Sequence, residues 1–153
     1  MKRPLIQLTI VWLGLLLAAP ALALAQPAKA DVAAQINAGY DLLERGQFDQ
    51  AQKVYEEILR QQPGHPIALN NLAAISCKQG KFEQALGQLN RALPQAKGYK
   101  ITLNRVCNVD GVCAAFRQST DNFGQENLED LIKSNILMVQ MAAANRGPGK
   151  SGK

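Results

Sequence analysis

The sequence repeats itself at one fixed interval, the distance along the chain from Gly46 to Gly80, and this period constrains the fold more than any other feature. The stretches RGQFDQA and QGKFEQA are two copies of one pattern. The copies align Gly46 with Gly80, Phe48 with Phe82 and Asn37 with Asn71. A fixed period in the range of about 20–50 residues is typical of stacked repeats, in which each unit is a pair of helices that cannot bury its apolar side alone. The chain is therefore predicted to form a short stack of helical hairpins.

Each copy carries the markers of two short helices. Gly46 and Gly80 are placed to end a first helix in a left-handed turn, and the phenylalanine two residues later then fills the corner between the helices. Helices are expected near residues 31–45, 48–61, 66–79 and 82–94. Over residues 32–97 the pattern resembles the tetratricopeptide repeat (TPR), a family built from such helix pairs. The resemblance implies two full repeats.

A third repeat begins but departs from the pattern. The stretch ITLNRVC (101–107) matches IALNNLA (67–73) at the same spacing, whereas Asp110-Gly111 interrupts the third copy. We expect a first helix that is broken at this point, and a small β-hairpin about Asp110-Gly111 is the alternative. Because about three units are needed for a stable stack, a helix from about residue 126 to 145 should cap it. The predicted fold class is all-α, a TPR-type solenoid with two full repeats, a broken third and a C-terminal capping helix.

The N-terminal residues have the composition of a targeting segment. Lys2 and Arg3 precede an uncharged run that ends in Ala23-Leu24-Ala25, a pattern that a signal peptidase accepts. We expect a cleaved signal peptide and export to a bacterial periplasm; the alternative is an uncleaved anchor, since the run is long enough to span a bilayer. The predicted organisation is a signal peptide (1–25), a linker (26–30), two repeats (31–97), a degenerate third repeat with the capping helix (98–145) and a disordered basic tail (146–153).

Three cysteines remain after the signal segment. Cys107 and Cys113 are six residues apart, which is about 9 Å along a helix and beyond the about 7 Å that a disulfide allows between Cα atoms. A disulfide between them is expected in an oxidising compartment, provided that the chain turns at Asp110-Gly111; packing cysteines without a bridge are the alternative. Cys77 is expected to be a small, inert, partly buried thiol, with a reactive or intermolecular thiol as the alternative.

The sequence contains no recognisable catalytic constellation. His65 is the only histidine, it lies in the turn between the repeats, and no nucleophile, phosphate-binding loop or zinc motif accompanies it. The net charge of +5 falls to +3 when Lys2 and Arg3 are removed, so a nucleic-acid footprint is not indicated. We expect no enzyme activity, no metal and no cofactor.

The family resemblance implies a concave groove, lined by the first helix of each pair, that binds a peptide or helix of a partner. The residues at its inner positions are Asn37, Tyr40, Glu44, Asn70, Asn71, Ala74, Lys78 and Arg105. An asparagine amide offers both a donor and an acceptor, so it can hold a peptide backbone without reading side chains. Capture of a C-terminal carboxylate, as in one TPR subclass, is matched by Asn71 and Arg105 but not by Ile36 and Tyr40.

The predicted function is a non-enzymatic interaction module, a periplasmic adaptor or assembly factor for a cell-envelope complex such as a secretion, pilus or cell-wall machine. The alternative is a permanent structural subunit packed through its capping helix. Leu137 and Met141 point away from the other apolar residues of that helix and are candidates for a second interface. They are covered either by the segment that contains Phe116 and Phe123, or by a partner or a second copy of the chain.

Overall fold

The structure, a computed structural model, describes residues 31–109, 113–119 and 125–146. The predicted signal peptide and linker and nearly all of the predicted tail lie outside these residues. The described part contains five helices and three short strands. The helices are α1 (Val32–Glu44), α2 (Phe48–Gln61), α3 (Pro66–Lys78), α4 (Phe82–Ala96) and α5 (Leu128–Arg146). None of the described helices is long and apolar enough to cross a membrane.

The first four helices form the two predicted hairpins, with ends within two residues of those expected. Gly46 and Gly80 adopt φ values of 71° and 73°, which confirms the left-handed stops that end α1 and α3. The starts of these helices are capped as well. Asp31 Oδ1 accepts a hydrogen bond from the amide of Ala33 at 3.1 Å, and His65 Nδ1 accepts one from the amide of Ala68 at 3.3 Å.

Small residues bring the helices of each hairpin close together. A methyl group built at Gly39 in α1 would lie 2.7 Å from the ring of Tyr55 in α2, so only glycine leaves room for that ring. Ala73 in α3 and Ala85 in α4 are also fully buried. Nearly every residue of α3 is buried, because this helix is covered by α2, α4 and the strands. The hydrophobic core is therefore centred on α3.

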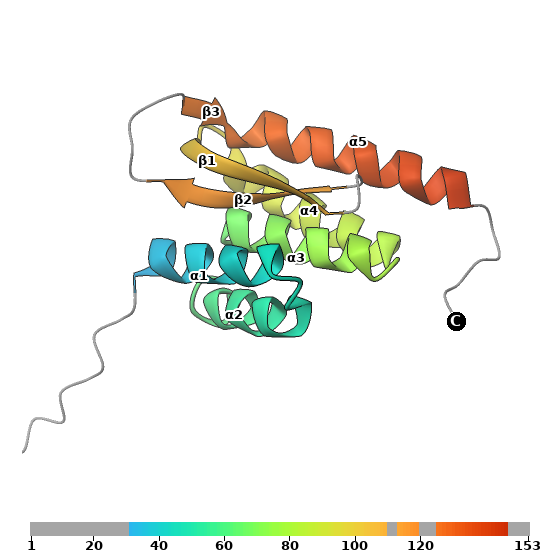
Figure 1. Cartoon of the computed structure of the whole chain (residues 1–153). Helices are drawn as coiled ribbons and strands as arrows, with labels where there is room; N and C mark the ends of the chain where they lie inside the picture. Colours follow the sequence, from blue (N-terminus) through green and yellow to red (C-terminus); the bar gives the residue numbers. More distant parts are fainter. Residues whose placement is uncertain (1–30, 110–112, 120–124, 147–153) are drawn as a thin grey trace, which may run out of the picture.

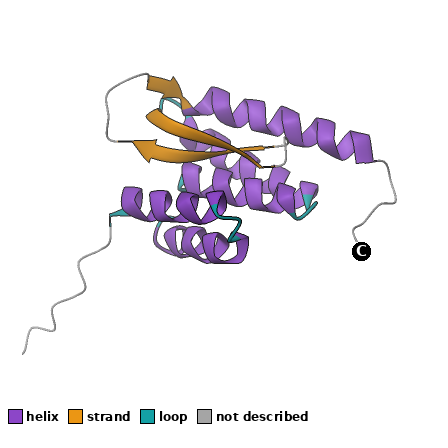
Figure 2. Ribbon diagram, in the orientation of Figure 1, coloured by secondary structure: helices purple, strands orange, loops and turns teal. Residues whose placement is uncertain are grey.

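A three-stranded antiparallel sheet follows the hairpins. It consists of β1 (Lys100–Val109), β2 (Cys113–Ser119) and β3 (Gln125–Asn127), in the order β2-β1-β3. Figure 1 shows β2 running above α1 and α3, and Figure 2 shows the strands between the repeat helices and α5. The expected broken third helix is therefore wrong, and the β-hairpin alternative is confirmed.

The physical reason lies in the residue pattern of β1. Apolar residues alternate with polar ones over KITLN, and Ile101, Thr102, Val106 and Val109 are β-branched. This alternation fits a strand better than a helix, although the same residues match the repeat register. The turn at Asp110-Gly111 lies outside the described residues.

The capping helix is confirmed. α5 begins directly after β3, and the amide of Leu128 donates a hydrogen bond to the carbonyl of Tyr99 at 3.1 Å. Leu128, Ile132, Asn135 and Val139 recur at helical spacing and are fully buried. The helix packs mainly against α4, which closes the end of the repeat stack. The predicted TPR-type solenoid of helical hairpins with a C-terminal helix is therefore confirmed, with a small sheet in place of the broken third repeat.

Candidate peptide-binding surface

The concave face, formed by the sides of α1, α3 and α5 that carry Asn37, Asn71 and Asn135, is occupied by β2 of the same chain. The central contact is made by Asn71 in α3. Its Nδ2 donates to the carbonyl of Phe116 at 2.8 Å, and its Oδ1 accepts from the amide of Phe116 at 2.8 Å. One side chain therefore satisfies both backbone groups of one residue, as a neighbouring strand would do.

The contact is repeated at every second residue of β2. The amide of Gln118 donates to Asn37 Oδ1 at 2.9 Å. At the other end of the strand, Asn135 Oδ1 accepts from the amide of Ala114 at 2.9 Å, and Asn135 Nδ2 donates to the carbonyl of Ala114 at 2.8 Å. Backbone groups of alternate residues point to the same strand edge, so these asparagines line one edge of β2 while β1 pairs with the other.

The side chains of Asn70, Asn71 and Asn135 are joined by hydrogen bonds, and Asn37 holds the same edge of β2; we call these four residues the asparagine ladder. Asn70 Nδ2 donates to the carbonyl of Ala114 at 2.9 Å, and Asn135 Nδ2 donates to Asn70 Oδ1 at 2.7 Å. Behind it, Asn71 Nδ2 donates to the hydroxyl of Tyr55 at 3.1 Å. Asn70, Asn71 and Asn135 are completely buried, so any hydrogen bond lost here leaves a polar group without water.

Side chains of β2 add a smaller set of contacts. Phe116 is 1% exposed and belongs to the hydrophobic core, as does Ala115. Arg117 Nη1 lies 2.6 Å from Asp41 Oδ1 in α1, in a pair that remains partly exposed. The helices therefore hold this strand chiefly through its backbone, with one buried aromatic ring and one ion pair as side-chain anchors.

The remaining residues predicted to line the groove are placed differently. Tyr40 and Ala74 are buried, whereas Glu44 and Lys78 are exposed near the ends of α1 and α3. Lys78 Nζ lies 5.6 Å from the centre of the Phe48 ring. Arg105 lies in β1 and not in a third helix, so the helical position expected for carboxylate capture is absent.

The roles of Asn135 and Asp41 were not predicted from the sequence, and the strand that they hold was foreseen only in the β-hairpin alternative. Asn135 lies much further beyond Asn71 than one repeat period, because the sheet separates α4 from α5. The alternating pattern of β1 was the signal that could have shown the insertion.

The groove was expected to be open to a partner, and this part of the prediction is corrected by the structure. Asn37 and Asn71 do meet an extended backbone, but the backbone belongs to the same chain. A strand of the chain itself fills the place that a bound peptide would take.

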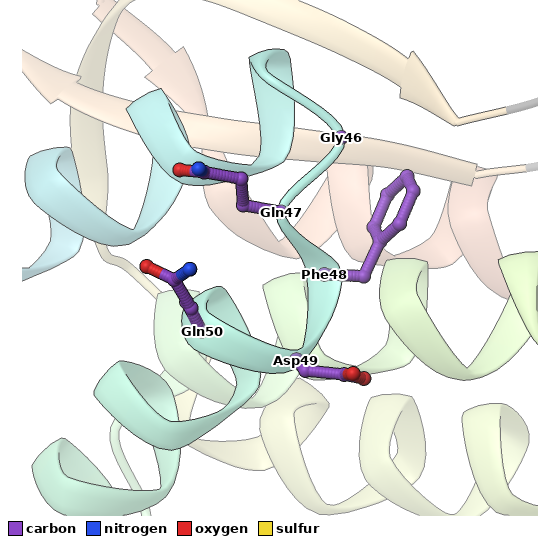
Figure 3. A pocket seen from close by; sticks show the side chains of 5 residues that line it. All are labelled: Gly46, Gln47, Phe48, Asp49 and Gln50. Carbon is purple, nitrogen blue, oxygen red and sulfur yellow. The ribbon is translucent and has the colours of Figure 1, made fainter.

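A hollow at the turn between α1 and α2 offers no comparable chemistry. It has a volume of about 230 Å³ and is lined by Gly46, Gln47, Phe48, Asp49 and Gln50. Figure 3 shows the four side chains diverging from the turn instead of converging on one space. Asp49 is the only ionisable group among them, so the hollow lacks a pair of groups for acid–base chemistry.

His65 and Cys77, the other residues considered for catalysis or reactivity, are both buried in the fold. His65 is buried and caps α3, and burial lowers the pKa of its imidazole below the ordinary value. Cys77 is a buried thiol. Within residues 31–109, 113–119 and 125–146, no group of three or more His, Cys, Asp or Glu side chains could hold a metal ion.

The disulfide between Cys107 and Cys113 stays a prediction, because these two side chains lie outside the described ones. The backbone register sets Cys107 opposite Ala115 and Cys113 opposite Val109. The two cysteines are therefore offset by two positions across the hairpin.

Residues 42–100 match the family model described as Tetratricopeptide repeat. The match runs from α1 through α4 to the first residue of β1, and together with the two helical hairpins it supports a TPR protein. A search of the curated proteins and a search of the solved structures found no match. TPR repeats generally mediate protein–protein interaction and are generally not enzymes.

Proposed function

We propose that the protein is exported to a bacterial periplasm and serves there as a non-enzymatic adaptor or assembly factor for a cell-envelope complex. In this proposal the concave face binds an extended segment of a partner protein. The observation that supports it is the asparagine ladder, which holds the backbone of β2 at three alternate residues. These backbone contacts do not depend on the sequence of the strand, so they can hold a foreign segment as well as β2.

A partner segment must replace β2, because both need the same asparagine amides. The surroundings of β2 indicate which segment would fit. A small residue takes the place of Ala115, an aromatic residue fills the buried site of Phe116, and a basic residue pairs with Asp41. The partner is therefore expected to present an extended segment with a small, an aromatic and a basic residue in succession.

The test is a rescue experiment on a weakened resident strand. Phe116→Ala removes the buried ring and should lower the melting temperature. A synthetic peptide with the sequence of residues 113–119 should then bind the variant and restore part of the lost stability. The same peptide should not stabilise a variant that also carries Asn71→Ala. Peptide binding that is unaffected by Asn71→Ala, or no binding at all, contradicts the proposal.

A second candidate function is a structural subunit packed permanently into an envelope assembly through α5. It is favoured by Leu137 and Met141, which are 57% and 58% exposed on that helix. Size-exclusion chromatography of the exported protein at low concentration separates the two functions. A well-behaved monomer supports the adaptor, and a chain that is insoluble or always multimeric supports the subunit.

A further inference from the structure

α5 takes the place of the first helix of a third repeat. Asn37, Asn71 and Asn135 hold Gln118, Phe116 and Ala114, which are equal steps of two residues along β2. α5 also packs on α4, as α3 packs on α2. The three asparagines therefore mark one common register for α1, α3 and α5, although the last interval in the sequence is nearly twice the first.

This register shows which side of α5 is uncovered. The residues two and six positions after the asparagine are Gly39 and Leu43 in α1, Ala73 and Cys77 in α3, and Leu137 and Met141 in α5. In α1 and α3 they are buried, and Gly39 touches Tyr55 of α2. In α5 the corresponding side chains are more than half exposed. Within the described residues, α5 has no second helix on the side that α2 and α4 cover in the two complete hairpins.

The exposed side of α5 has the spacing of a helix-pairing seam. Ser134, Leu137, Met141 and Ala144 are all exposed and follow one another at intervals of three, four and three residues. This is the spacing of the inner positions of a coiled coil. The seam lies on the side of α5 opposite its buried residues, Leu128, Ile132, Asn135 and Val139.

We propose that this seam pairs with the seam of a second copy of the chain, the two α5 helices running antiparallel about a two-fold axis. Leu137 then packs against Met141 of the second copy, and Ser134 lies opposite Ala144 of the second copy. The large side chains meet at the centre and the small ones at the ends, so the seam is complementary to itself. This inference does not rest on the proposed adaptor function.

The size of Leu137 favours a second copy over a TPR-type second helix. Gly39 and Ala73, at the equivalent position, are small and let α2 and α4 approach closely. Leu137 prevents such an approach, whereas an equally bulky seam can interdigitate with it.

Charge does not oppose the pairing. Lys133 lies beside the seam. Its Nζ is 2.7 Å from Glu129 Oε1 and 3.7 Å from Asp130 Oδ1 in its own helix. The two-fold arrangement places Lys133 beside the uncharged Asn145 of the second copy. Among the side chains that the structure describes, no like charges therefore face each other at the seam.

The association should be weak. The seam contributes four side chains from each copy, whereas stable dimers use about 20–30 residues a side. Dimers are therefore expected only at high protein concentration, with a dissociation constant of roughly 0.1 to 1 mM.

Sedimentation equilibrium of the exported protein, expressed from the full chain, tests the proposal. The average mass should rise with concentration up to about 1 mM, and Leu137→Glu with Met141→Glu should lower the association constant at least about tenfold. Leu137→Glu with Met141→Lys should retain association, because antiparallel pairing sets Glu opposite Lys. Gln140→Glu, exposed on α5 but outside the seam, is the matched control and should associate as the unchanged protein does. Circular dichroism checks that each variant is folded.

Three results would overturn the proposal. One is an unchanged protein that stays monomeric throughout the concentration range, and another is a double-glutamate variant that associates as well as the unchanged protein. The third is a Glu/Lys variant that loses association as completely as the double-glutamate variant, because antiparallel pairing would then be wrong.

Discussion

The helical hairpins and the strand that they hold are stabilised in different ways. The helices α1 to α4 pack through apolar and small residues, such as Gly39 against Tyr55, and each helix contacts its neighbours in the sequence. β2 is attached to α1, α3 and α5 mainly by amide hydrogen bonds between residues 21 to 81 positions apart. Apolar packing tolerates substitutions that conserve side-chain volume, whereas a buried hydrogen-bond network fails when one partner is removed.

The largest expected effect is that of Asn71→Ala. The change removes four hydrogen bonds and leaves the amide and carbonyl of Phe116 without their partners in a buried site. The free energy of unfolding should fall by about 3–5 kcal/mol, measured by urea denaturation. Asn90→Ala, at an exposed position of α4, is the matched control and should change the free energy of unfolding by less than about 0.5 kcal/mol. A loss below about 1 kcal/mol for Asn71→Ala would show that the ladder is not a major support of the fold.

The next effect tests the packing of the hairpins. Gly39→Ala places a methyl group 2.7 Å from the ring of Tyr55 and should destabilise the protein by about 1–3 kcal/mol. Gly87→Ala in α4 is the matched control, because nothing lies within 4 Å of its added methyl group. The free energy of unfolding of that variant should rise by about 0.5–1 kcal/mol, because alanine has a higher helix propensity than glycine. Equal effects at the two glycines would contradict the close approach of α1 and α2.

A pH effect is expected at His65. Burial lowers the pKa of its imidazole in the folded protein, so the unfolded chain binds a proton at this residue more tightly than the folded chain does. Stability attributable to this residue is therefore complete above the ordinary value of 6.5 and falls as the pH drops below it. Thermal melts between pH 8 and pH 5 should show the loss. His65→Asn, which can cap α3 without titrating, should remove this part of the pH dependence.

The smallest effect is expected at the ion pair between β2 and α1. Arg117→Ala removes the contact with Asp41, but both side chains are partly exposed and screened by water. The free energy of unfolding, measured by urea denaturation, should fall by about 0.2–1 kcal/mol, and the difference should shrink in high salt. A much larger loss would mean that side chains, and not the backbone of β2, carry the attachment.

The difference between the locally packed hairpins and the long-range contacts of β2 explains what the sequence could predict. The hairpins follow from local signals, because Gly46, Gly80 and the apolar stripes act within one or two helical turns. The ladder depends on contacts across the chain, so Asn37 and Asn71 were recognised as backbone-binding residues but their occupant was not. Asn135 escaped because the inserted sheet breaks the period that relates Asn37 to Asn71.

The exposed pair on α5 shows the opposite case. Leu137 and Met141 were placed on the outer side of the helix from periodicity alone, and their exposure of 57% and 58% confirms that placement. Of the two aromatic residues expected as a cover, Phe116 is buried in the core instead, and Phe123 lies outside the described residues. The side of a helix on which a residue lies follows from its position in the sequence, so the sequence predicts it well.

Amide hydrogen exchange of β2 tests the central claim, that the concave face is filled by a strand of the same chain. In the isolated protein, the amides of Ala114, Phe116 and Gln118 should exchange as slowly as those in the middle of α3, because each donates to an asparagine side chain of the ladder. Asn71→Ala should speed the exchange of the Phe116 amide more than that of the amides within α2. Exchange of the three amides at the rate of an unstructured chain, with α3 still protected, would contradict the account and restore the open groove that the sequence suggested.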